Sequence, residues 1–332
     1  MVFKRLLGSL GAGGPKVDTV LDPGAVAPGG VLGGQVHLEG GDADFTIEHI
    51  TLELVARVEV EHGDGESEGT AAFDRQVVGG PFRLAAGERR SVPFSIALPW
   101  ETPITELHGQ HLGIALGVRT ELGVAGARDK GDLDPLTVRP LPVQEAVLEA
   151  FGQLGFGFAS ADLEAGHISG TGQRLPFYQE IELTPAPAYA HRVDEIEVTF
   201  LANPAGVEVV LEADKRGGYG AEGGDALTRV TIDHAEAART DWNAQVESWL
   251  DRLADRRPPH ASGFGYADHT AHGHHDEHGS GRRSGPGVGT AVAAGAAGLA
   301  VGVAGGLVAA EVVDEVGDFF EGDDEGGEGE EG

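Results

Sequence analysis

The sequence predicts an all-β protein made of two antiparallel β-sandwich lobes, followed by one amphipathic helix and a low-complexity tail. Apolar and polar residues alternate with period two along several short segments, which is the pattern of half-buried strands. The chain holds 54 glycines among its 332 residues, a composition that suits short strands joined by turns. Long helical segments do not alternate with these strands, so an α/β sheet is not expected.

The first lobe is expected over residues 1–142. Its clearest strand is residues 45–60, where the alternation places one face on a core and the other in water. The turn-forming residues Gly40, Gly41 and Asp42 precede this strand. Further strands are expected at residues 81–84, 90–98, 112–124 and 136–138.

The second lobe is expected over residues 143–257. A helical turn or two is expected at residues 143–151, and a longer helix at residues 241–253. Strands are expected at residues 177–183, 195–200, 207–213 and 228–232. The apolar residues of the longer helix form one stripe, which favours docking on the lobe over binding a separate partner. This stripe contains Trp242, Val246, Trp249, Leu250 and Leu253.

Composition excludes several classes of function. The net charge is −31 and the chain has only 23 Lys and Arg residues, so a nucleic-acid partner is not expected. The absence of cysteine excludes disulfides, cysteine-bound zinc, iron–sulfur clusters and thiol nucleophiles. No dinucleotide fingerprint lies between a strand and a helix. The first residues lack a hydrophobic run long enough for a signal peptide, which makes a cytoplasmic location the expectation.

Several segments together resemble one known family. They are residues 3–7 with 17–21, Pro28-Gly29-Gly30 with residues 34–36, residues 98–105, residues 175–182 and residues 212–218, followed by the tryptophan-containing helix. Over residues 1–253 the chain resembles the sporulation-control proteins of Gram-positive bacteria. The resemblance implies an arrestin-like fold of two β-sandwich lobes. It also implies a non-catalytic regulatory or scaffold role in developmental and cell-division control, with protein partners that include cell-division or cytoskeletal proteins.

The tail does not match this family and divides into three parts. Residues 258–286 form a linker rich in histidine and glycine, residues 287–310 an apolar Gly/Ala/Val segment, and residues 311–332 an acidic segment expected to be disordered. The linker holds the strongest metal candidate, because imidazole suits Zn²⁺, Ni²⁺ or Cu²⁺, and a metal-dependent activity of this linker is the last alternative function. Nothing fixes these ligands in place, so weak binding and no resident cofactor are expected. The candidate ligands are His269, His272, His274, His275 and His278, beside His260.

The apolar segment supports an alternative function, that of a membrane-associated structural protein. The uncharged run 288–310 is long enough to span a bilayer. Gly298, Gly302 and Gly306 repeat every four residues, as on a close-packing helix face. Six glycines weaken insertion, and a flexible linker remains the other interpretation. Under the alternative, the lobes would lie on the cytoplasmic side of a membrane.

Three residues within the lobes are candidate contacts with a partner or a membrane. Trp100 follows the end of a strand and either caps the core or is an exposed anchor, and the cap is favoured. Lys215 and Arg216 bring two cations into an acidic protein, although a turn is the simpler interpretation. The carboxylate pairs Glu180/Glu182 and Glu195/Glu197 are expected on an ordinary solvated strand face.

Overall fold

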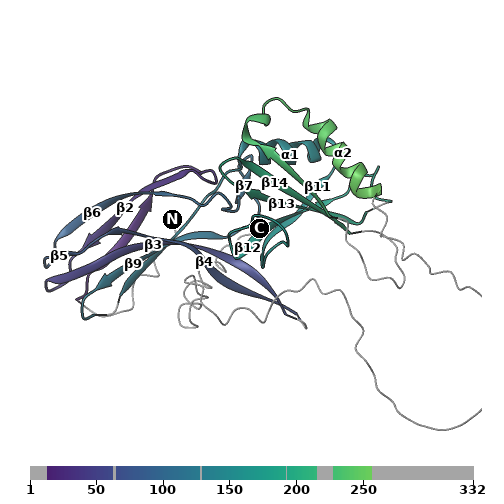
Figure 1. The fold of residues 1–332 in the computed structure, drawn as a ribbon. Helices are drawn as coiled ribbons and strands as arrows, with labels where there is room; N and C mark the ends of the chain where they lie inside the picture. Colours follow the sequence, from purple (N-terminus) through teal and green to yellow (C-terminus); the bar gives the residue numbers. More distant parts are fainter. Residues whose placement is uncertain (1–12, 63–64, 128, 192, 215–226, 256–332) are drawn as a thin grey trace, which may run out of the picture.

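The computed structural model describes residues 13–62, 65–127, 129–191, 193–214 and 227–255 (Figure 1). Within these ranges most residues lie in strands, and the predicted all-β class is confirmed. The three tail segments and their candidate residues lie outside the described residues. Neither helix within the described ranges is long and apolar enough to cross a membrane.

The first lobe is a sandwich of two sheets. The smaller sheet has the order β1-β2-β6, and the facing sheet contains β10-β9-β3, with β4 and β5 also paired to β3. A short hairpin, β7–β8, lies apart from both sheets. The strands are β1 (Lys16–Leu21), β2 (Val31–Glu39), β3 (Phe45–His62), β4 (Gly65–Gly79), β5 (Phe82–Leu84), β6 (Arg89–Ala97), β7 (Glu106–Leu107), β8 (Gln110–His111), β9 (Leu116–Val124) and β10 (Lys130–Pro135).

The core of the first lobe follows the predicted alternation. Leu52 and Leu54 of β3 are both 1% exposed and belong to the same hydrophobic core as Val36 and Phe94 of the opposite sheet. The other face of β3 is also covered in its middle, since Glu53 is only 6% exposed. Both edges of β3 are paired as well, with β9 on one side and β4 on the other, so β3 lies inside the sheet.

The second lobe is one antiparallel sheet with helices on one face. Its strands follow the order β11-β12-β13-β14-β15. The described residues of this lobe therefore form a single sheet, whereas the sequence predicted a second sandwich. Helices α1 (Pro142–Gln153) and α2 (Trp242–Asp255) take the place of an opposing sheet. The strands are β11 (Gly157–Ala165), β12 (Phe177–Thr184), β13 (Glu195–Ala202), β14 (Gly206–Asp214) and β15 (Thr228–Asp233), and a 3₁₀ turn, η1 (His234–Glu236), follows β15.

Helix α2 packs within the chain, as its apolar stripe predicts. Val246 and Trp249 are 0% exposed, and Leu250 and Leu253 are almost as deeply buried. Trp242 donates a hydrogen bond from Nε1 to the Ala237 carbonyl at 2.8 Å and stacks edge-on against Trp249. The Asp241 carboxylate accepts the Ala244 N–H at 3.2 Å, the bond of an N-terminal cap.

The two lobes share one sheet. Strand β3 is 18 residues long and runs from the first lobe toward the second, and Figure 1 shows β3 and β4 leaving the sandwich together. At its far end β3 pairs in parallel with β11, where Glu59 lies opposite Glu164. Eight of the ten strands of this sheet therefore form one path from β10 in the first lobe to β15 in the second, and β4 and β5 pair with β3 beside it.

Replacement of Trp249 tests the docking of α2. Trp249→Ala removes a fully buried ring and should lower the free energy of unfolding by about 3–5 kcal/mol. Denaturant unfolding followed by circular dichroism measures this loss. Glu247→Ala on the exposed face of the same helix is the control and should change stability by less than about 0.5 kcal/mol. Equal effects of the two variants would contradict this account of α2.

Candidate functional site at the lobe junction

The segment Pro99–Thr105 between β6 and β7 lies where the two lobes meet. Pro99 and Pro103 have no N–H to donate to a sheet, so the chain leaves the sandwich here. Thr102, Ile104 and Thr105 are nevertheless buried. A buried segment outside a sheet must find partners for its backbone groups elsewhere.

Gln179 of β12 supplies partners for Ile104. Its side-chain oxygen accepts the Ile104 N–H at 2.9 Å, and its side-chain nitrogen donates to the Ile104 carbonyl at 2.9 Å. An amide side chain that makes both bonds reproduces the pairing of a neighbouring strand. Because Ile104 is 0% exposed, the loss of either bond would leave a buried backbone group unpaired.

Glu101 makes the reciprocal contact from the first lobe. One carboxylate oxygen accepts two backbone N–H bonds from the second lobe, from Arg174 at 2.7 Å and from Leu175 at 2.9 Å. Bonds to an ionised acceptor are about twice as strong as neutral ones. The carboxylate thereby fixes the start of the Leu175–Glu182 segment against the first lobe.

Trp100 packs between the lobes. Its ring lies against Gly29 and also packs at a tilt of 31° against His234 of η1, with ring centroids 5.2 Å apart. Gly29 has φ +69°, and a Cβ added there would lie 2.5 Å from the indole, so both backbone and space require glycine. Trp100 is partly buried against the core, which is the capping position that the sequence favoured.

A fourth contact joins the lobes through aromatic rings. Phe73 of β4 meets Phe177 of β12 edge-on, with ring centroids 5.5 Å apart. This geometry is preferred for aromatic pairs. The junction therefore combines backbone pairing, a charged acceptor and two ring contacts, and it uses residues from three of the segments that carry the family resemblance.

Comparisons with known proteins show to which family the chain belongs. The family model described as "SpoOM protein" matches residues 3–217. The chain belongs to the SpoOM protein family. It is 35% identical over 263 residues to the sporulation-control protein spo0M of Bacillus subtilis (strain 168), a match that covers 76% of this chain and 98% of that protein. The crystal structure of Spo0M from Bacillus subtilis is similar with a TM-score of 0.64 and 33% identity, over 73% of this chain and 99% of the solved one.

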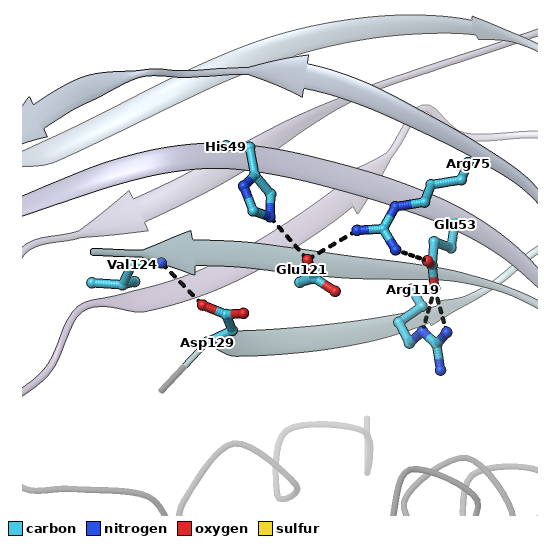
Figure 2. Close-up of polar contacts among 7 residues, drawn as sticks. All are labelled: His49, Glu53, Arg75, Arg119, Glu121, Val124 and Asp129. Atoms are coloured by element: carbon cyan, nitrogen blue, oxygen red, sulfur yellow. Dashed lines mark hydrogen bonds and ion pairs between the residues drawn. The ribbon is translucent and has the colours of Figure 1, made fainter. Parts of the chain in front are cut away.

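The outer face of the first lobe carries a network of charged side chains (Figure 2). Glu53 of β3 is bonded by Arg75 of β4 at 2.7 Å and by Arg119 of β9, whose Nε donates at 2.9 Å. Glu121 accepts bonds from Arg75 at 3.1 Å and lies 2.9 Å from His49 Nε2. Cross-strand neighbours of opposite charge stabilise a sheet. The network therefore ties β9, β3 and β4 together on the solvent side of the core.

The second lobe has an acidic sheet face on the side away from its helices. Opposed pairs Asp162–Glu180, Glu182–Glu197 and Glu197–Glu212 bring carboxylates together from four strands, β11 to β14. The expected solvated face does not describe Glu180, which is half-buried. Burial, and then the charges of the neighbouring carboxylates, raise the pKa of Glu180 to about 8. When Glu180 is protonated it carries no charge, so the sheet has one repulsive contact between like charges fewer.

The described residues include two groups of side chains with the composition of a metal site. One is Asp162, Glu164 and Glu180 within the acidic face, and the other is His108, Glu145 and Glu149 near the junction. The sequence did not single out the second group, because its histidine and its carboxylates lie far apart in the chain. The predicted candidates Lys215, Arg216, Gly298, Gly302 and Gly306, together with the histidines of the linker, lie outside the described residues.

The charge network makes a prediction about stability. Arg119→Ala removes one of the two cations beside the buried Glu53 carboxylate and should lower the free energy of unfolding by at least about 2 kcal/mol. Because Arg75 remains as a partner, the loss is smaller than for a buried carboxylate left without any cation. Denaturant unfolding measures the loss. The control is Lys16→Ala, which breaks the exposed pair with Glu39 and should cost less than about 1 kcal/mol. A similar small loss in both variants would show that burial does not strengthen the network.

The raised pKa of Glu180 makes a prediction about pH. As the pH rises, the unfolded chain releases the Glu180 proton near the ordinary pKa of 4.5, whereas the folded protein keeps it up to about pH 8. Stability from this group is fully present below about pH 4.5 and is lost as the pH rises through about 8. Glu180→Gln should therefore gain at least about 1 kcal/mol over the parent protein as the pH rises across this window.

Unfolding by denaturant at a series of pH values measures this gain. Glu182→Gln removes one charge from the same face and is the matched control. Identical pH profiles for the parent protein and Glu180→Gln would contradict the raised pKa.

Proposed function

We propose that this protein is a cytoplasmic regulator of sporulation that acts by binding other proteins, as a scaffold without catalysis of its own. Its membership of the SpoOM family and its similarity to the sporulation-control protein spo0M of Bacillus subtilis support the sporulation role. The observation that carries the scaffold role is the junction. Residues from segments shared with the family are used to hold the two lobes in one orientation.

A fixed orientation is useful to a binding protein. If the lobes are held in place before a partner arrives, binding does not have to order them, and less of the interaction energy is lost. A partner that touches both lobes then recognises their spacing as well as their surfaces. Cell-division or cytoskeletal proteins are the first partners to test.

One edge of the shared sheet is suited to binding an extended segment of a partner. Strand β15 is the last strand on the described path, and it pairs with β14 on one side. The edges of the smaller sheet are less suitable. Pro93 in β6 lacks an N–H, and the Thr19 N–H of β1 already donates to Asp132 at 2.6 Å. A peptide strand added beside β15 would gain backbone hydrogen bonds.

The proposal predicts that the junction is required for function. In the native host, deletion of the gene should lower the number of heat-resistant spores, and the full chain should restore it. The double variant Glu101→Gln, Gln179→Ala weakens two contacts between the lobes, each worth about 1 kcal/mol, and should recover at least about tenfold less partner in affinity capture.

The control is Glu48→Gln, Gln110→Ala, which makes the same kinds of change at exposed positions. It should behave as the parent protein. Normal spore numbers in the deletion strain would overturn the sporulation role. Undiminished partner recovery by the folded double variant would overturn the scaffold role.

A further inference from the structure

His108, Glu145 and Glu149 meet where the β7–β8 hairpin of the first lobe approaches helix α1. The His108 ring lies between the two carboxylates. Its Nδ1 is 3.4 Å from Glu145 Oε1, and its Nε2 is 3.4 Å from Glu149 Oε1. Between 44% and 50% of each of the three side chains is exposed, so ions in solution can reach the group.

Helix α1 brings the two carboxylates together. Glu145 and Glu149 are four residues apart and therefore lie on one face, one turn above the other. Like charges at this spacing repel and destabilise a helix. A cation between the two carboxylates removes that repulsion, which gives this face of the helix an affinity for positive charge.

The hairpin places an imidazole opposite this face. His108 and Gly109 form its two-residue turn, and both have positive φ, 52° and 76°. Such turns favour asparagine followed by glycine, because asparagine tolerates this backbone conformation. Histidine takes the asparagine position here, and each of its two ring nitrogens faces one of the carboxylates. Imidazole nitrogen is a ligand suited to zinc and its neighbours among the metals.

We propose that His108, Glu145 and Glu149 bind one divalent transition-metal ion of the Zn²⁺ class. The ligand atoms of the three residues lie within 4.8 Å of one another. Zn²⁺ holds nitrogen and oxygen ligands at about 2.0–2.2 Å, so a movement of roughly 1 Å by each exposed side chain closes the set around an ion. One nitrogen and two oxygens are a ligand set that Zn²⁺ accepts, and water completes the coordination.

The bound ion links the two lobes. One ligand comes from a hairpin of the first lobe and two from the first helix of the second, so the ion would tie them together beside the Pro99–Thr105 segment. Binding requires the neutral imidazole, because a protonated ring has no lone pair to offer. This site goes beyond the proposed scaffold role, which does not depend on it.

The test uses the full chain, and its design separates this site from the histidine-rich linker. His269, His272, His274, His275 and His278 are changed to asparagine together, which gives a background whose linker has lost its main ligands. Zn²⁺ is added, and its binding is measured by competition with a chromophoric chelator. Co²⁺ is used in parallel, because its visible absorption reports a nitrogen-and-oxygen coordination sphere.

In this background one equivalent of Zn²⁺ should bind, and the thermal midpoint should rise with Zn²⁺ concentration. His108→Asn keeps a residue suited to the turn and should weaken Zn²⁺ binding at least about 10–100-fold, as should Glu149→Gln. His111→Asn, at an exposed position in the same hairpin, is the matched control and should bind as the background does.

Three results would overturn the proposal. They are an absence of Zn²⁺ binding in the background, binding that His108→Asn and Glu149→Gln leave unchanged, and equally tight binding of Ca²⁺. The last result would show that the carboxylates alone attract cations, because Ca²⁺ selects oxygen ligands. Thermal midpoints of the variants without metal show whether a loss of binding reflects a loss of fold.

Discussion

The hydrogen bonds between the Gln179 amide and the Ile104 backbone are the contact on which the arrangement of the two lobes depends. Two prolines force the Pro99–Thr105 segment out of the sandwich, yet the segment is buried, so its polar groups need partners from another part of the chain. Gln179 provides them for Ile104. Glu101, which lies in the same segment, accepts hydrogen bonds from backbone N–H groups of the second lobe. Each lobe thereby satisfies groups that the other leaves unpaired.

Two poorly exposed glutamates, Glu53 in the first lobe and Glu180 in the second, are accommodated in different ways. In the first, Arg75 and Arg119 both donate hydrogen bonds to the nearly buried Glu53 carboxylate, so two cations lie beside it. In the second, Glu180 lies among other carboxylates, and its raised pKa lets it keep a proton instead. Within the described residues, one sheet therefore contains a carboxylate paired with two cations and a carboxylate that keeps a proton.

Local pattern predicted much of the fold. Strand β3 and helix α2 were predicted because their apolar residues follow periods that the chain alone reveals. Strand β4 was not predicted, because glycine and charged residues interrupt its alternation, and pairing along β3 holds it in place. The strand expected at residues 136–138 makes only the single bridge between Val26 and Val138, and β10 precedes it at residues 130–135.

The junction was predicted only in part. The resemblance singled out residues 98–105 and 175–182, and Pro99 and Pro103 indicated a loop, but nothing in either segment says that they touch. Gln179 and Ile104 are 75 positions apart, and their contact follows from the path of β3 into the second lobe. The contact of His108 with Glu145 and Glu149 was likewise not predicted. A search by ligand spacing in the sequence detects only sites whose residues are neighbours in the chain.

The central claim is that the junction fixes the orientation of the lobes, and a distance measurement between them tests it most directly. The chain has no cysteine, so Ser95→Cys in β6 and Ser248→Cys in α2 place two spin labels at exposed positions without competing sites. Pulsed electron-spin resonance should give one narrow distance distribution, which broadens when Gln179 is changed to alanine. A broad distribution in the parent protein, or one that Gln179→Ala leaves unchanged, would contradict the account.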